Sequence, residues 1–159
     1  MRLRHSVRGV VLDESDRMLL CRIATSSTTV VWAAPGGGIE PGESRLDALR
    51  RELSEEVGLD LDGEPPHVWR QRVVADGLVP GYDGVVNDYF LVRTESFEPR
   101  GTMSSAELAA ENISGARWWS LAEIRDYPGP DLFSPRDLAT PLSALLADGP
   151  PAHPVALGL

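Results

Sequence analysis

The amino-acid sequence predicts one α/β domain built around a mixed sheet. A chain of 159 residues has the length of a single domain, and its 42% hydrophobic content is enough for a buried core. Runs that suit β-strands flank one strongly amphipathic helix, and several neighbouring runs look hairpin-connected, which favours antiparallel pairing. Since no internal repeat or composition shift marks a boundary, we expect one domain over residues 1–146. The Pro-rich segment 147–159 is expected to be a tail with little order.

The N-terminal part is predicted to supply the first strands. Residues 5–12 and 17–24 are apolar runs separated by the turn-like sequence DESD, so we expect them to form an antiparallel pair. A polar loop at 26–29 leads to a short extended piece at 30–35. The glycines at 36–38 and the sequence EPGE that follows are expected to form a loop.

A helix is predicted to begin near Ser44 and to end at Gly58. Asp47 follows Ser44 at the spacing of a capping box, and Gly58 is placed as a C-terminal cap. Four apolar residues recur with the helical period and form one stripe to be buried: Leu46, Leu49, Leu53 and Val57.

The C-terminal half is predicted to add further strands and weaker helices. The expected strands are 67–75, 88–93 and 113–121, and the expected helices are 105–111, 121–127 and 135–149, the last interrupted near Pro141. Trp118 and Trp119 are adjacent in a strand and therefore face opposite sides, so at least one of them is expected in the core.

Composition and charge argue against several classes of protein. The net charge is -9 with no block of Lys or Arg, which argues against a nucleic-acid partner. No stretch approaches the apolar length of a membrane span, and the N-terminus is too polar for a signal peptide, so we expect a cytoplasmic protein with no membrane contact. The single cysteine, Cys21, lies in an apolar strand and is expected to be a buried thiol.

The predicted helix carries three carboxylates on one side, Glu52, Glu55 and Glu56. Like charges at this spacing cost roughly a few tenths of a kcal/mol per pair, and a solvated helix face is the alternative explanation. Clustered carboxylate oxygens are also what Mg²⁺ or Mn²⁺ requires. The glycines before the helix would let backbone approach a phosphate or metal, and Arg51 could orient a carboxylate or contact an anion. A bound cation would reverse the local sign in a chain that otherwise repels phosphates.

The spacing of these residues matches a known pattern. From Gly37 the chain runs through five residues to Glu43, then seven residues to Arg51-Glu52-Leu53, one residue to Glu55-Glu56, and one residue to Gly58-Leu59. This run resembles the signature of the Nudix hydrolases at every defined position. The resemblance covers these residues directly, and the order of the strands extends it over about residues 4–146. It implies a Nudix-type α/β/α sandwich with a mixed sheet.

The resemblance also implies roles for individual residues. Glu52, Glu55 and Glu56 would bind one or more Mg²⁺ ions, with Mn²⁺ as the alternative, and the carbonyl of Gly37 is a frequent further ligand. Arg51 and Glu43 would form an ion pair that holds loop and helix in register.

The reaction that the resemblance implies is hydrolysis of a nucleoside diphosphate linked to another moiety, by attack of water on phosphorus. The family does not place its general base uniformly, so Glu52 could be ligand or base. A distal glutamate is the other option, with Glu111 first and Glu107 second. Either could instead be an ordinary surface residue.

The substrate is not determined by the sequence. Ala75 stands about where many ADP-ribose hydrolases have proline, and Tyr82 lies several residues after the position of the tyrosine of many dinucleoside polyphosphate hydrolases. A nucleoside triphosphate, including an oxidised one, is therefore the default. ADP-ribose or a nucleotide sugar is one alternative, and a non-catalytic nucleotide-sensing module is another. A homodimer is possible.

Several aromatic and basic residues are candidates for base stacking or phosphate contact. They are Trp32, Arg70, Arg72, Tyr82 and Phe133. Packing is the alternative for Trp32. Arg8, Arg70 and Arg72 alternate with apolar neighbours, which suits a solvated strand face as well as a phosphate clamp.

Overall fold

The computed structural model describes residues 1–159 and has a nine-stranded mixed sheet as its middle layer. The strands are β1 (Leu3–Leu12), β2 (Met18–Ala24), β3 (Val30–Ala33), β4 (Gly36–Gly38), β5 (His67–Val74), β6 (Gly84–Arg93), β7 (Ile113–Trp119), β8 (Leu132–Phe133) and β9 (Val155–Leu157). They follow the order β8-β3-β2-β1-β6-β5-β9, with β4 paired to β1 and β7 paired to β2.

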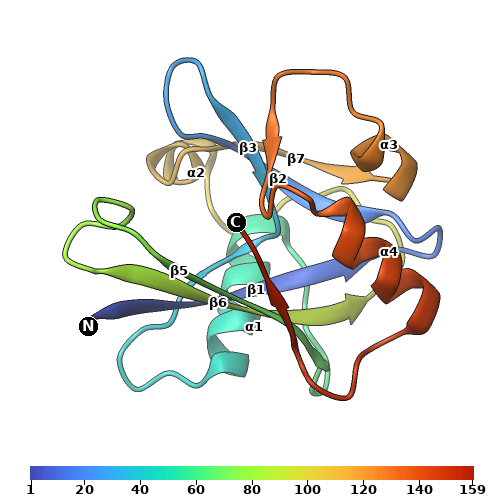
Figure 1. Ribbon diagram of the computed structural model, residues 1–159, viewed down its shortest axis with the longest axis horizontal. Coiled ribbons are helices and arrows are strands. Elements are labelled where there is room, and N and C mark those ends of the chain that lie inside the picture. The colour runs from blue at the N-terminus through green and yellow to red at the C-terminus, as the bar shows by residue number, and fades with distance from the viewer.

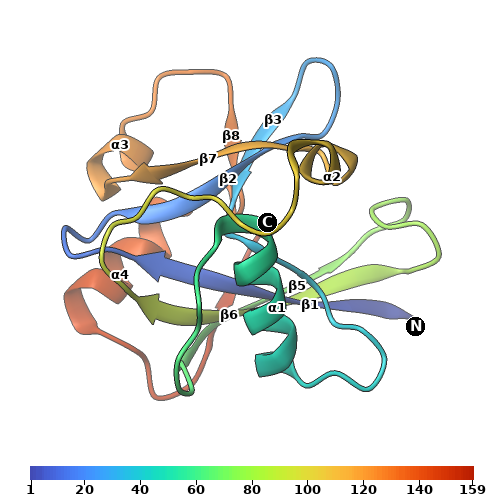
Figure 2. The ribbon, with the colours of Figure 1, turned by 180° about the vertical axis from the view of Figure 1, so that it is seen from behind.

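Helices cover both faces of this sheet, which confirms the predicted α/β/α sandwich. Helix α1 (Arg45–Val57) packs on one face, and α3 (Leu121–Arg125) and α4 (Ala139–Asp148) pack on the other (Figures 1 and 2). The short helix α2 (Ser105–Ala110) contributes no buried residue. No helix combines the length and apolar character that a membrane crossing requires.

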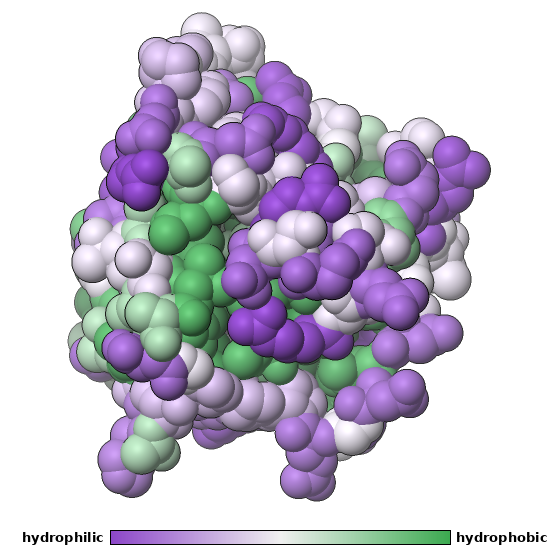
Figure 3. All heavy atoms as spheres, turned by 90° about the vertical axis from the view of Figure 1, so that its right-hand side faces the viewer, coloured by the Kyte–Doolittle hydropathy of each residue, from purple (hydrophilic) through white to green (hydrophobic).

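Two apolar cores separate the layers, and the alternation of β1 explains both. Val7 and Val11 face α1 and pack with Leu53, whereas Val10 and Leu12 face α4. The α1 core contains Leu49, Leu53, Val57 and Cys21, so the buried thiol and three of the four predicted stripe residues are confirmed. Leu46, in the first turn of the helix, is only partly buried. The other core is larger and holds Trp69, Tyr89, Trp119, Leu142 and Leu145. The end of the molecule where α3 and α4 lie shows a strip of apolar surface among polar residues (Figure 3).

Strand β1 is central to the sheet, and its pairing differs from the prediction. It runs parallel to β6 along its length, from Leu3↔Gly84 to Leu12↔Arg93. It meets β2 only at Leu12↔Met18, because β4 pairs with β1 at residues 6–8 and the two strands diverge there. The expected antiparallel pair is therefore confined to its turn, and the glycines expected to form a loop form a strand.

The C-terminal segment also differs from the prediction. Expected to have little order, residues 155–157 instead form β9, which pairs in parallel with β5 from Trp69↔Val155 to Gln71↔Leu157. The outer edge of β5 offers unpaired backbone groups, and Val155–Leu157 satisfies them. Pro141 does not interrupt the last helix, because α4 begins at Ala139 and proline is tolerated in a first turn.

Candidate active site

Helix α1 presents the predicted carboxylates at the edge of its buried face. The Ser44 side chain accepts a hydrogen bond from the backbone N–H of Asp47, and Gly58 caps the other end, so the helix has the predicted limits. Glu52 and Glu56 are each only 7% exposed, because they adjoin the leucine stripe. Glu55 is half-buried.

The glycine strand β4 lies directly against these carboxylates. A Cβ at Gly37 would lie 2.5 Å from Oε1 of Glu52, so a side chain there would displace the carboxylate. The backbone N–H of Gly36 donates a hydrogen bond to Oε1 of Glu56 at 3.1 Å. Backbone and carboxylates therefore share one tight site.

Arg51 connects the segment before the helix to the helix itself. Its guanidinium donates to both oxygens of Glu43, at 2.9 Å from Nε and 3.0 Å from Nη2, and Nη2 also donates to the carbonyl of Gly38. The expected Glu43–Arg51 ion pair is thus present and bidentate. Hydrogen bonds from Arg51 lower the pKa of Glu43 to about 2.

The same guanidinium also contacts the carboxylate cluster. Nη1 of Arg51 donates to Oε1 of Glu52 at 2.9 Å and lies 3.6 Å from Oε2 of Glu55. A positive charge therefore already sits between two of the predicted metal ligands. No three His, Cys, Asp or Glu side chains of residues 1–159 form a ready metal-binding group, since Glu52 is turned toward Arg51 and Glu56 toward Gly36.

Burial makes the charged form of two carboxylates costly. It raises the pKa of Glu56 to about 8, against the opposing effect of the Gly36 N–H, and the charge of Glu52 adds to the rise. Burial also raises the pKa of Glu52, although the hydrogen bond from Arg51 opposes it. A cation would relieve both, and carboxylate oxygens next to a glycine backbone are the donor set that a hard divalent ion prefers. The residues therefore fit such an ion.

Glu111 joins these glutamates from a distant part of the chain. It follows the last residue of α2 and lines a cavity of about 300 Å³ together with Glu52 and Glu56. An adjoining, wider cavity of about 680 Å³ is lined by Glu52, Glu111, Arg51 and Tyr82. The structure thus brings Glu111 and Tyr82 to the cleft.

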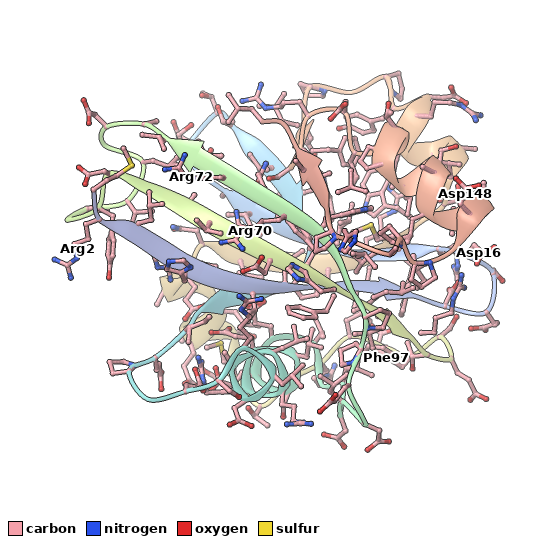
Figure 4. All side chains as sticks on the ribbon, turned by 60° about the horizontal axis from the view of Figure 1, so that its bottom comes forward. Arg2, Asp16, Arg70, Arg72, Phe97 and Asp148 are labelled. Carbon is pink, nitrogen blue, oxygen red and sulfur yellow. The ribbon has the colours of Figure 1, made fainter.

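Other predicted residues do not reach the cleft. Glu107 is held by its own helix, where Oε1 accepts a hydrogen bond from the backbone N–H of Ser104 at 3.0 Å. Arg70 and Arg72 point from the same side of β5 and are exposed (Figure 4). Arg70 lies 3.8 Å from Asp88, so it belongs to a separate ionic group on the sheet.

Trp32 and Phe133 are core residues. Trp32 is 8% exposed, and its indole N–H donates to Asp131 at 2.9 Å. The Trp32 ring packs edge-on against the Trp119 ring, with 5.0 Å between the ring centroids. Phe133 on β8 is the strand partner of Trp32 on β3. The structure shows the packing alternative for Trp32, because β3 directs the Trp32 ring toward the core beneath α3 and α4.

The sequence does not predict Arg4 as a residue of the cleft, and it leaves Arg8 open between a phosphate clamp and a solvated strand face. Arg4 and Arg8 line the 300 Å³ cavity together with the glutamates. Their signal is the alternation of polar residues Arg4, Ser6 and Arg8 along β1, which a solvated strand face would produce equally well. Cys21 lines the same cavity, but burial raises the pKa of its thiol strongly, so it is no nucleophile.

The fold and the cleft together define an α/β/α protein whose cleft gathers glutamates beside a glycine strand. The NUDIX domain family model matches residues 2–137, and the chain therefore belongs to the Nudix family.

Known relatives and structures agree with this membership. The chain is 36% identical over 75 residues to the nucleoside triphosphatase NudI of Enterobacter sp. (strain 638), which covers 42% of this chain and 53% of that protein. It is 37% identical over 99 residues to an RNA pyrophosphohydrolase of Campylobacter jejuni subsp. doylei, which covers 57% of this chain and 62% of that one. The chain thus spans less than two thirds of the length of these curated relatives. The solution structure of the E. coli ORF135 protein has the same fold, with a TM-score of 0.66 at 22% identity over 96% of both chains.

Proposed function

We propose that this protein is a Mg²⁺-dependent hydrolase that cleaves the pyrophosphate bond of a nucleoside diphosphate linked to another moiety. Nucleoside triphosphates, including oxidised ones, are the proposed substrates, and the name of NudI as a nucleoside triphosphatase supports this choice. The observation that carries the proposal is the burial of Glu52 and Glu56 against the glycine strand, in a cleft that Glu111 completes.

Glu52, Glu55 and Glu56, with the carbonyl of Gly37, are the residues that would hold Mg²⁺, or Mn²⁺ in its place. A bound divalent ion would neutralise phosphate charge and lower the pKa of a coordinated water. Arg51 keeps the Glu52 carboxylate in place and ties it to Glu43.

We assign proton acceptance from the attacking water to Glu111, with Glu52 as the alternative. Glu111 lines the same cavity as Glu52 and Glu56, and nothing in its own helix holds its carboxylate in the way that Ser104 holds Glu107. Tyr82, on the wall of the wider cavity, is the proposed stacking partner of the base.

The experiment is a panel of nucleoside triphosphates, nucleotide sugars, ADP-ribose and dinucleoside polyphosphates, assayed with and without Mg²⁺ and with product identification. Glu56→Gln should abolish Mg²⁺-dependent turnover, and Glu111→Gln should reduce kcat by about 10²-fold or more as expected for loss of a general base. The exposed Glu98→Gln is the matched control, with activity unchanged. Near-wild-type turnover in the Glu56 variant would contradict the proposal.

The alternatives have distinct outcomes in the same panel. Preference for ADP-ribose or a nucleotide sugar would change the substrate class while leaving the glutamate roles intact. A 5′-triphosphorylated oligonucleotide belongs in the panel because one relative is named an RNA pyrophosphohydrolase. Binding of nucleotides with no turnover under any condition would support a sensing module instead.

A further inference from the structure

The cavity that the glutamates line also has two arginines in its lining. Arg4 and Arg8 are four residues apart on β1, and both line the cavity that Glu52, Glu56 and Glu111 share. The guanidinium of Arg4 lies over Gly38 of the glycine strand. In a chain of net charge -9, two arginines facing a carboxylate cluster are the groups able to attract an anion there.

Arg8 is held in place at two points and keeps donors free. Its Nη1 donates to the carbonyl of Ala34 at 2.7 Å, and its Nε donates to Oδ1 of Asn87 at 3.3 Å. A guanidinium carries five N–H donors, and these two bonds leave three of them without a protein partner in a residue that lines the cavity.

The hydrogen bond from Arg8 to Asn87 begins a buried series of side-chain amide hydrogen bonds. Nδ2 of Asn87 donates to Oε1 of Gln71 at 3.0 Å, and Nε2 of Gln71 donates to the carbonyl of Gly158 at 2.8 Å. Asn87 is 7% exposed and Gln71 is 4% exposed, so water does not substitute for these partners. The series crosses β1, β6 and β5 and ends on the segment that follows β9.

The direction of each amide in this series depends on the next one. Because the carbonyl of Gly158 can only accept, it requires the NH₂ group of Gln71, which leaves Oε1 of Gln71 to accept from Asn87. Asn87 must then present its oxygen to Arg8. Without the Gly158 carbonyl, both amides could turn over, and Asn87 could present NH₂ to a guanidinium. The backbone N–H of Arg136 donates to the carbonyl of Leu159 at 2.9 Å, which holds the C-terminal residue beside the segment that leads into α4 (Figure 1).

We propose that Arg8 binds a phosphate group of the substrate, and that Asn87, Gln71 and residues 155–159 are positioning residues that hold the Arg8 guanidinium toward the cleft. The proposal rests on the proposed function and deepens it. Arg8 would contact a phosphate next to the one that the glutamates would hold through the cation, within the pyrophosphate unit that the proposed function already assigns. Residues 155–159 thereby become part of the support of the site.

The test uses the full chain with Mg²⁺ and inorganic tripolyphosphate as the probe, with binding measured by calorimetry. Arg8→Gln should weaken binding by at least about tenfold, the size expected for a lost charge-assisted hydrogen bond, and Arg8→Lys should recover part of it. Arg93→Gln is the matched control, because Arg93 is an exposed strand arginine paired with Asp16. Its binding should equal that of the wild type.

The positioning role has its own readout in a double-mutant cycle. Gln71→Leu should weaken tripolyphosphate binding in the wild-type background and have no further effect in the Arg8→Gln background, because Gln71 acts through Arg8. Melting temperatures identify any variant that fails to fold. If Arg8→Gln does not fold, tripolyphosphate binding is compared between Arg8→Lys and the wild type.

Three results would overturn the inference. One is tripolyphosphate binding by folded Arg8→Gln or Arg8→Lys that equals the wild type. A second is no binding by the wild type. The third is full additivity of the Arg8 and Gln71 effects, which removes the positioning role. Failure of every nucleotide to react, with Arg8-dependent tripolyphosphate binding intact, would contradict the hydrolase proposal alone.

Discussion

Gly37 determines how closely the glycine strand can approach Glu52. Since a Cβ there would lie 2.5 Å from Oε1, Gly37→Ala should push the carboxylate out of place. A displacement of about 1 Å in a catalytic group can cost about 10²-fold in rate, so kcat/KM should fall by that order while the protein remains folded. Steady-state kinetics and a thermal melt on the same sample check both parts.

Gly42→Ala is the control for that substitution. Nothing lies within 4 Å of a Cβ at Gly42, but its φ of 80° is strained for alanine. This variant should lose about 1 kcal/mol of stability and keep its activity. Equal activity in the two variants would show that the Gly37 contact is irrelevant to turnover.

Glu56 links stability to pH in the metal-free protein. Its folded-state pKa of about 8 lies above the ordinary value of 4.5, so the folded protein retains a proton that the unfolded chain has lost. The free energy of unfolding should therefore decrease as pH rises from about 4.5 to about 8, and Mg²⁺ should oppose the decrease by favouring the ionised form. Urea unfolding at pH 5 and pH 8, with EDTA or Mg²⁺, measures both effects.

The variant Glu56→Gln isolates the contribution of this residue. Because glutamine does not titrate, the metal-free variant should show a smaller loss of stability over the same pH range. An identical pH dependence in wild type and variant would assign the slope to other groups, such as Glu52, whose pKa burial also raises.

At the scale of the elements, the Glu43–Arg51 pair attaches α1 to the segment before it. The folded-state pKa of Glu43 is lowered to about 2 by the hydrogen bonds from Arg51, below its ordinary value of 4.5. Its stabilising contribution is therefore fully present above about pH 4.5 and is lost as pH falls toward 2. Glu43→Gln should be less stable than the wild type at pH 7, and the difference should shrink at pH 3. A difference that stays constant between these pH values would exclude the charge of Glu43 as its cause.

Helix α1 could be predicted from sequence because its signals are local. Ser44, Asp47 and Gly58 set its ends, and Leu49 and Leu53 set its buried face, all within neighbouring turns. The strand β4 could not be predicted in this way. Three glycines carry no side-chain pattern, and they become a strand only because β1 offers an edge at residues 6–8.

The residues of the site also differ in whether local sequence signals predict them. Glu52, Glu55 and Glu56 follow from one helix and its spacing, whereas the choice between Glu111 and Glu107 depends on which carboxylate the N-terminal capping box of α2 holds. Arg8 shows the same limit, since strand alternation gives its side of the sheet but not the distant residues Asn87 and Ala34 that orient it. Strand β9 could not be predicted either, because it forms only by pairing with the distant strand β5.

For the whole molecule, the single sheet makes the two apolar cores one cooperative unit. Leu53 lies in the α1 core and Leu142 in the α4 core, and both are fully buried on opposite faces. Each change to alanine should cost about 2–5 kcal/mol, and the two costs should add within about 0.5 kcal/mol because the side chains share no neighbours. Urea denaturation followed by fluorescence and by circular dichroism should give one coincident transition for each variant. Two separate transitions in either single variant would show that one layer unfolds alone, and β1, whose alternate residues enter both cores, would then not couple them.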